Sequence, residues 1–213
     1  MSEETESGTA ERLEQLWAGD FGDAYTERNR DSFDRGGFWR GLTASHPFEN
    51  ALEVGCNVGE NLLALSEFVG AGSLAGVDVN ERALAVARAA LPQAELRHAA
   101  ARELPFADGA FELVFTAMVL IHQPDETLRT VLGEIVRCSS RFVLSIEYES
   151  AKDVGVPYRG HRGALFKRPY GEIYVATFPR LRLVDGGFIG LAEGWDDVTW
   201  WLLEQEPTAP RGA

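Results

Sequence analysis

Residues 51–65 read ALEVGCNVGENLLAL, and this stretch decides the fold. It predicts a short apolar strand, a turn punctuated by glycines, and the first turns of a helix. Gly55 and Gly59 allow the tight or left-handed backbone that a side chain would block. They also let the main chain approach a ligand closely at a helix N-terminus, where N–H groups are free. The stretch therefore predicts a site for a nucleotide-like ligand, although the dinucleotide pattern G-x-G-x-x-G is absent.

A carboxylate stands at the distance from this turn that such a site needs. Residues 73–79 predict a second strand that carries Asp78 near its end, about twenty residues beyond the glycines. A carboxylate at that place accepts hydrogen bonds from both hydroxyls of a ribose. Because the carboxyl ends of parallel strands meet at one edge of a sheet, we expect the turn and Asp78 to lie together.

Strands and helices alternate through the middle of the chain. Strands are predicted over residues 51–54, 73–79, 94–98, 111–116 and 141–147, with helices over 60–68, 81–91 and 124–137. This alternation indicates an α/β fold with a parallel sheet. The strands are apolar without strict alternation, which is typical of a sheet covered by helices on both faces. Two closing strands, 180–185 and 198–204, are predicted to pair antiparallel.

The chain is expected to form one domain. Its predicted parts are a disordered N-terminus (1–10), a single domain (11–206) that opens with a helical lid or cover (11–47), and a C-terminal tail (207–213). The first ten residues are rich in Ser, Glu, Thr and Gly, a composition typical of disorder. Residues 149–170 are polar and interrupted by Gly and Pro, so they predict a loop with little regular structure. A short helix is predicted over 172–178.

Composition limits the classes of partner. The 213 residues carry a formal net charge of −13, which argues against nucleic-acid binding because that needs a basic surface. The two cysteines form no Cys-x-x-Cys pair and the four histidines are scattered, so no metal site is predicted. Neither a signal peptide nor a run of about 20 apolar residues is present. We therefore expect a cytoplasmic, reduced protein without membrane contact, as a monomer or homodimer.

Three motifs follow one another through this region. They are Glu53-x-Gly55-x-Asn57-x-Gly59, then Gly76-Val77-Asp78, then Leu104-Pro105-Phe106-x-Asp108-x-x-Phe111-Glu112-Leu113-Val114. Together they resemble the class I S-adenosylmethionine-dependent methyltransferases, over residues 48–147. The resemblance implies a Rossmann-like fold with a seven-stranded, mostly parallel sheet, an antiparallel final strand, and helices on both faces.

The resemblance also implies a cofactor, S-adenosylmethionine. Glu53 and Gly55 would lie near its methionine portion, and Asp78 would hold the ribose. The full set of implied cofactor residues in this region is Glu53, Gly55, Asn57, Gly59, Asp78, Val79, Ala100, Ala101 and Met118. Two positions depart from many relatives. Asn57 replaces a glycine, and its amide either reaches the cofactor or stabilises the turn. Residues 99–101 are alanines where an Asp often binds the adenine amine, which leaves adenine to backbone groups or to residues 102–103.

A narrower resemblance rests on residues outside the motifs as well. Residues 21–29 read FGDAYTERN, residues 55–62 read GCNVGENL, and the C-terminal part is rich in tryptophan. These features resemble the group labelled pseudaminic acid biosynthesis-associated methylases. The resemblance implies that the lid brings Tyr25 and Asn29 to the cofactor and Arg28 to the substrate. The label describes a pathway association and leaves the substrate open.

Methyl transfer to a hydroxyl or ammonium requires a base to remove a proton. His122, which follows the fourth strand, and Glu147 and Tyr148, which follow the fifth, are candidates at the cofactor end of the sheet. His161 is a further candidate. The alternative for His122 is a polar loop histidine without a catalytic role.

Residues 158–170 form a basic cluster in an acidic protein. Arg159 and Arg162 within it suit forked contacts with a carboxylate or phosphate. The cluster either folds over the pocket to bind an anionic acceptor or is a solvated loop that offsets nearby acidic residues.

These observations favour an S-adenosylmethionine-dependent methyltransferase that acts on a small polar, anionic metabolite. One alternative is chemistry on the cofactor itself, either lysis or cyclisation to azetidine-2-carboxylate with release of methylthioadenosine. Another is a non-catalytic S-adenosylmethionine-binding protein that acts through a partner. A nicotinamide dehydrogenase is least favoured, because the G-x-G-x-x-G spacing is missing.

Overall fold

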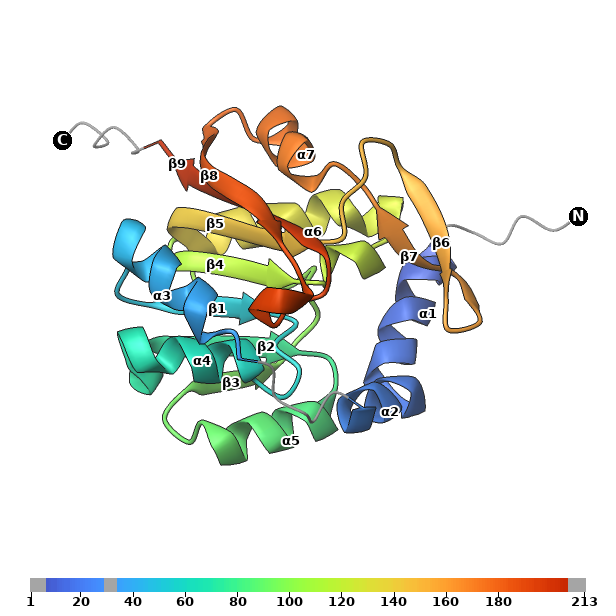
Figure 1. Ribbon diagram of the computed structural model, residues 1–213. Helices are drawn as coiled ribbons and strands as arrows, with labels where there is room; N and C mark the ends of the chain where they lie inside the picture. The colour runs from blue at the N-terminus through green and yellow to red at the C-terminus, as the bar shows by residue number, and fades with distance from the viewer. Residues whose placement is uncertain (1–6, 29–33, 207–213) are drawn as a thin grey trace, which may run out of the picture.

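The computed structural model describes residues 7–28 and 34–206 and is built on a seven-stranded sheet (Figure 1). The strands are β1 (Ala51–Val54), β2 (Leu74–Asp78), β3 (Glu95–His98), β4 (Phe111–Ala117), β5 (Ser139–Glu147), β8 (Leu181–Ile189) and β9 (Val198–Gln205). Their order is β3-β2-β1-β4-β5-β9-β8. Strands β1 to β5 pair in parallel, whereas β9 runs antiparallel to both β5 and β8. The predicted Rossmann-like sheet with an antiparallel final strand is confirmed.

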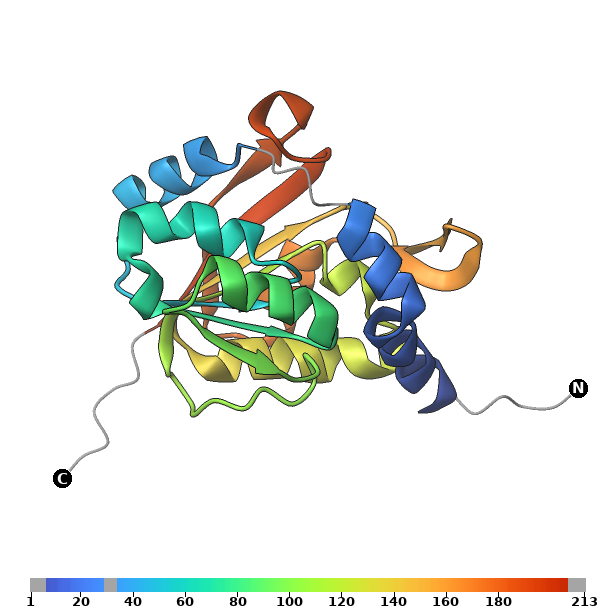
Figure 2. The ribbon, with the colours of Figure 1, turned by 90° about the horizontal axis from the view of Figure 1, so that it is seen from below.

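Helices cover both faces of this sheet. Helices α3 (Gly36–Ser45), α4 (Glu60–Val69) and α5 (Glu81–Ala90) contribute to one apolar cluster, and α6 (Asp125–Cys138) and α7 (Tyr170–Thr177) to the other. Figure 2 shows α3 and α4 on one side of the strands and α6 on the other. Because both faces are covered, all four residues of β1 are buried, Glu53 among them.

Most predicted boundaries agree with the structure. The strands and helices expected between residues 51 and 147 are confirmed to within two residues at each end, and the antiparallel pairing of the closing strands is confirmed. Strand β8 is longer than predicted. Gly186 and Gly187 do not end it, because their backbone continues to pair with Trp201 and Trp200 of β9.

The prediction of a loop over residues 149–170 is wrong for its central part. Strands β6 (Val154–Tyr158) and β7 (His161–Lys167) form an antiparallel hairpin outside the main sheet. Its turn consists of Arg159 and Gly160, which both have positive φ (46° and 87°), as a two-residue hairpin turn of the primed type requires. Pro157 is tolerated because both strands of an isolated hairpin are edge strands.

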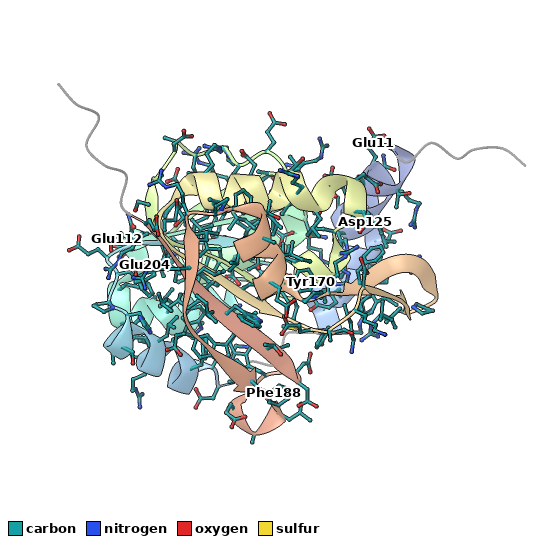
Figure 3. The ribbon with its side chains drawn as sticks, turned by 90° about the horizontal axis from the view of Figure 1, so that it is seen from above. Glu11, Glu112, Asp125, Tyr170, Phe188 and Glu204 are labelled. Carbon is teal, nitrogen blue, oxygen red and sulfur yellow. The ribbon has the colours of Figure 1, made fainter. Side chains whose placement is uncertain are left out.

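A buried arginine attaches this hairpin to the rest of the fold. Arg168 is only 2% exposed, and its guanidinium donates to Asp125 Oδ1 at 2.5 Å and to Asp153 Oδ2 at 2.9 Å. It also donates to the main-chain carbonyl of Gln123 at 2.9 Å. Figure 3 shows Asp125 and Tyr170 near the base of the hairpin. One residue of the predicted basic cluster is therefore used to hold β7 against α6.

Two N-terminal helices lie beside the hairpin (Figure 1). Helix α1 (Ser7–Ala18) begins within the segment 1–10 for which disorder was expected, and α2 (Asp20–Arg28) occupies a stretch without an evident helical period. Trp17 contacts Tyr158 at 6.3 Å between ring centroids, and Phe21 contacts His161 at 5.1 Å. We call α1, α2 and the hairpin the roof. Among the described residues, no helix is long and apolar enough to cross a membrane.

Candidate active site

A cavity of about 210 Å³ lies beyond the carboxyl ends of β1, β2 and β4, with helices α1 and α2 of the roof as one of its walls. The glycine turn, Asp78, the segment after β4, helices α1 and α2, and the segment between β8 and β9 line it. This is the place where open parallel sheets bind ligands. The cavity therefore unites the first two sequence motifs, whereas the third motif, residues 104–114, does not line it.

The glycine turn forms the floor of the cavity. Gly55 has φ 76° and Gly59 has φ 82°, and Gly59 is the N-cap of α4. The N–H groups of Gly55 and Cys56 donate to the Val77 carbonyl, which fixes the turn against β2. A Cβ atom on Gly55 would stand 2.4 Å from Val119 Cγ2. Only glycine fits there, because both the backbone conformation and the space forbid a side chain.

Asp78 lines the cavity, and two main-chain N–H groups hold its carboxylate. Its Oδ2 accepts from Asn57 and its Oδ1 accepts from Asn80, each at 2.8 Å. Burial raises the pKa of Asp78 above its ordinary value, and these hydrogen bonds oppose that shift. Each carboxylate oxygen can accept a further hydrogen bond. The position therefore suits a ligand with two neighbouring hydroxyls.

Asn57 connects the floor of the cavity to the roof. It adopts the left-handed conformation with φ 46°, and its Oδ1 accepts a hydrogen bond from the buried Thr26 hydroxyl of α2 at 3.1 Å. Asn57 also lines the cavity. Both expected roles, a ligand contact and stabilisation of local structure, are compatible with this placement.

A double-mutant cycle separates these two roles of Asn57. We expect Thr26→Val to lower the free energy of unfolding by about 1 kcal/mol, the usual value of one hydrogen bond, and Asn57→Ala by about 2–3 kcal/mol, because alanine also strains the left-handed backbone of residue 57. The double variant should lose little more than Asn57→Ala alone, because the two residues share that bond. Denaturant unfolding of the ligand-free protein measures the cycle. Fully additive losses would contradict the coupling, and weaker ligand binding in Asn57→Ala than in Thr26→Val would identify a direct ligand contact.

Glu53, Asn61 and Arg35 form a hydrogen-bonded chain on the cavity wall. The Asn61 amide donates to Glu53 Oε1 at 2.7 Å, and Asn61 Oδ1 accepts from Arg35 Nη1 at 2.8 Å. Among the described residues, the second carboxylate oxygen of Glu53 has no partner. Burial raises the pKa of Glu53 to about 8, although Asn61 and Arg35 lower it in part. A carboxyl group that is buried, half satisfied and next to a cavity is a typical ligand contact.

His122 lies in the cavity wall beneath the roof. Its ring packs against Trp17 at 4.4 Å and Tyr158 at 5.2 Å between centroids. Its Nδ1 lies 2.5 Å from the Ala164 carbonyl, so we assign the proton to Nδ1, which leaves Nε2 as an acceptor. Burial lowers the pKa of His122 to about 4, and the imidazole is neutral at pH 7.

The other three catalytic candidates do not line the cavity. Glu147 is buried, and its carboxylate accepts from the N–H groups of residues 119–121, so it holds the segment that carries His122. Burial raises the pKa of Glu147 to about 7. The Tyr148 hydroxyl donates to Asp196 Oδ2 at 2.7 Å, and Asp196 does line the cavity. His161 packs against Phe21 in the roof.

The remaining predicted residues divide between the cavity and other places. Tyr25, Val79, Ala101 and Met118 line the cavity, whereas Gly59 and Ala100 do not. Asn29 and the side chain of Arg162 lie outside the described residues. Arg28 is exposed, and Arg159 lies over the Tyr158 ring at 5.8 Å in the hairpin turn; neither lines the cavity.

Several cavity residues are absent from the sequence predictions. They are Trp17, Thr26, Arg35, Asn61, Trp195 and Asp196. Asn61 lies two residues beyond the glycine turn and just before the apolar residues Leu62 and Leu63 of the predicted helix, so its polar side chain was a usable signal. Arg35 and Trp195 come from distant segments, and the Arg35 guanidinium lies over the Trp195 ring at 4.4 Å. No local pattern predicts that contact.

The fold and the cavity together define a Rossmann-like methyltransferase architecture, and comparisons with known proteins agree. The sequence model of the family described as a methyltransferase domain matches residues 51–140. The demethylmenaquinone methyltransferase of Bacillus cytotoxicus is 36% identical over 189 residues, which cover 84% of this chain and 73% of that relative. The chain therefore belongs to the class I S-adenosylmethionine-dependent methyltransferases, and its cofactor is S-adenosylmethionine.

Two further similarities have narrower scope. The demethylmenaquinone methyltransferase of Lysinibacillus sphaericus is 37% identical over 95 residues, so the chain matches only 41% of that relative's length. The crystal structure of Burkholderia thailandensis 1,6-didemethyltoxoflavin-N1-methyltransferase, with bound 1,6-didemethyltoxoflavin and S-adenosylhomocysteine, superposes with a TM-score of 0.74. It is 14% identical and the alignment covers 92% of this chain and 90% of that one, so it supports the fold alone. The narrower resemblance to pseudaminic acid-associated methylases stays a prediction.

Proposed function

We propose that the protein transfers the methyl group of S-adenosylmethionine to a small polar acceptor bound beneath the roof. The observation that carries this proposal is one cavity that joins the glycine turn, Asp78 and Glu53. Asp78 would accept from the ribose hydroxyls, and Glu53 would accept from the ammonium of the methionine portion. The adenine would lie against Val79, Ala99 and Ala101, which line the cavity between β2 and the roof.

The acceptor would approach the sulfonium from the side of Trp17, Tyr25 and His122. In the transfer, the sulfur–methyl bond breaks and its electron pair stays on sulfur, while the nucleophile forms the new bond to carbon. Holding the nucleophile in line with the methyl carbon, within about 3–3.5 Å, lowers the barrier to this transfer. Any proton that leaves the acceptor can pass to Nε2 of His122. Since the pKa of His122 is about 4, it is a weak base, which favours an acceptor atom that needs little deprotonation.

The charges around the cavity support a neutral acceptor rather than the anionic one that the sequence favoured. That expectation depended on Arg28, Arg159 and Arg162, and the first two lie outside the cavity lining. The lining instead contains the carboxyl groups of Glu14, Glu53, Glu60, Asp78 and Asp196 beside one arginine, Arg35. An uncharged acceptor suits this lining better than an anion, because the carboxyl groups would repel a negative charge. An apolar or aromatic part of such an acceptor could pack against Trp17 and Tyr25.

The size of the cavity supports a moving lid. Its volume of about 210 Å³ is below the range of about 300–1,000 Å³ that is usual for sites of drug-sized ligands. Cofactor and acceptor together therefore require the roof to shift outward, in line with the lid expected over residues 11–47. The Thr26–Asn57 hydrogen bond is a contact that such a motion would break.

Cyclisation of the cofactor is a second candidate, which one observation favours. Glu53 Oε2 is a buried carboxyl oxygen without a partner among the described residues, on the cavity wall where the ammonium of the methionine portion would lie. Glu53 could thus take the proton of the cofactor's ammonium. The free amine would attack its own γ-carbon, the carbon–sulfur bond would break, and methylthioadenosine would leave with the electron pair.

Incubation with S-adenosylmethionine, alone and with a panel of small acceptors, separates the candidates by mass spectrometry. We expect S-adenosylhomocysteine only when an acceptor is present. Methylthioadenosine without an acceptor would instead establish cyclisation or lysis. Binding without any turnover across the panel would favour a non-catalytic role. The predictions of a cytoplasmic protein, a monomer or homodimer, and no nucleic-acid partner accompany this proposal.

A further inference from the structure

Arg35 has an unoccupied hydrogen-bonding edge on the cavity wall. Its side chain is 11% exposed, its Nη1 donates to Asn61, and its plane is held against the Trp195 ring. Its Nε is buried without a partner, and its Nη2 makes only a 3.9 Å contact with Glu60 Oε2. Within residues 7–28 and 34–206, the Nε–Nη2 edge therefore has no hydrogen-bond acceptor. This is the edge of a guanidinium that can bind both oxygens of a carboxylate.

Asn61 keeps Arg35 apart from a carboxylate of opposite charge. Its amide group donates to Glu53 on one side and its carbonyl accepts from Arg35 on the other. In the described part of the chain, no ion pair joins Arg35 to Glu53, and each keeps an unpartnered atom. The wall thus presents one positive group and one carboxyl group that a bound ammonium would ionise, separated by one amide. A ligand with an ammonium and a carboxylate on the same carbon complements this arrangement.

We propose that Arg35 binds the α-carboxylate of S-adenosylmethionine through Nε and Nη2, while Glu53 binds the ammonium. This inference rests on the proposed function, because it takes S-adenosylmethionine as the ligand of the cavity. Arg35 is then the residue that distinguishes the cofactor from analogues without a carboxylate. The competing role is structural, since Arg35 also ties the start of α3 to α4 through Asn61 and Glu60.

Binding of two ligands by calorimetry tests the assignment. Decarboxylated S-adenosylmethionine keeps the adenine, ribose, sulfonium and amine and lacks only the carboxylate. We expect the wild-type protein to bind S-adenosylmethionine about 10–100-fold more tightly than the decarboxylated ligand, as hydrogen bonds between charged groups allow. Arg35→Gln should lower the affinity for S-adenosylmethionine by that factor and change the affinity for the decarboxylated ligand by less than about twofold. Arg35→Lys keeps the charge without the fork and should lose part of the discrimination.

Arg40→Gln is the matched control. Arg40 lies on α3, is exposed, and stands over Phe68 outside the cavity, so this variant should leave both affinities unchanged. Equal affinity of the wild-type protein for the two ligands would overturn the carboxylate contact and leave the proposed function intact. An equal loss of both affinities in Arg35→Gln would also overturn it and indicate the structural role. Failure of the wild-type protein to bind either ligand would overturn the proposed function as well.

Discussion

Binding of S-adenosylmethionine at pH 6.5 is expected to release close to one proton for each molecule bound. In the ligand-free protein, burial raises the pKa of Glu53 to about 8, so its carboxyl group is protonated at pH 6.5. The cofactor's ammonium favours the carboxylate and expels that proton. The dissociation constant should therefore fall close to tenfold between pH 6 and pH 7, because this interval lies below the pKa of Glu53 in the free protein and above its lowered pKa in the complex. Calorimetry in two buffers of different ionisation enthalpy measures the released proton directly.

The variant Glu53→Gln should release almost no proton and bind S-adenosylmethionine about 10–100-fold more weakly at pH 7. Glu67→Gln on α4 is the matched control, because Glu67 is exposed and outside the cavity and should leave the pH dependence unchanged. As pH rises, the affinity for S-adenosylmethionine should increase, whereas the free energy of unfolding of the ligand-free protein should decrease. The folded pKa of Glu53 exceeds the unfolded value, so its contribution to stability is lost as pH rises from about 4.5 to 8. Proton release that persists in Glu53→Gln would show that another group carries the linkage.

Gly55→Ala is expected to lower the free energy of unfolding by about 2–5 kcal/mol. The left-handed conformation of residue 55 costs alanine about 1–2 kcal/mol, and overpacking adds about 1–3 kcal/mol. The overpacking arises because the new Cβ atom would stand 2.4 Å from Val119 Cγ2. Val119 belongs to the segment that carries Met118 and His122, so the variant should also weaken S-adenosylmethionine binding. Denaturant unfolding and calorimetry measure the two effects.

A second substitution isolates the steric part of this effect. In the Val119→Ala background, Gly55→Ala should cost only the conformational strain, so the double-mutant cycle should show a favourable coupling of about 1–3 kcal/mol. Gly133→Ala is the control, because nothing lies within 4 Å of the added atom and α6 favours alanine over glycine. Equal losses from Gly55→Ala with and without Val119→Ala would contradict the proposed clash.

The sheet was predictable wherever burial determines the pattern along the chain. Strands β1, β2, β4 and most of β5 are buried, so their apolar runs and the intervening helices can be recognised in the sequence, whereas the edge strand β3 is mostly exposed. The hairpin β6–β7 was not predictable in this way. It is an isolated ribbon interrupted by Pro157 and several glycines, and it is held by Arg168 from outside its own strands. Its stability depends on tertiary contacts that periodicity does not record.

The candidate site shows the same division. Gly55 and Asp78 follow from motif spacing, and both line the cavity. Arg35 reaches Asn61 from 26 positions earlier in the chain, and Trp195 approaches from the segment between β8 and β9. Arg159 of the basic cluster does not line the cavity, because a charge is visible in the sequence whereas its placement is not. Sequence spacing therefore predicts the floor better than the roof.

The hairpin and the N-terminal helices have a consequence for how this enzyme could be altered. The floor of the cavity comes from residues 51–122, whereas the roof comes from residues 7–28 and 154–167, on either side of that segment. Under the proposed function, most groups that hold the methyl donor come from residues 51–122, with Arg35 as an exception, whereas α1 and α2 cover the side on which the acceptor would bind. Chimaeras that exchange only residues 7–28 are therefore expected to change the range of acceptors while binding of S-adenosylmethionine stays largely unchanged.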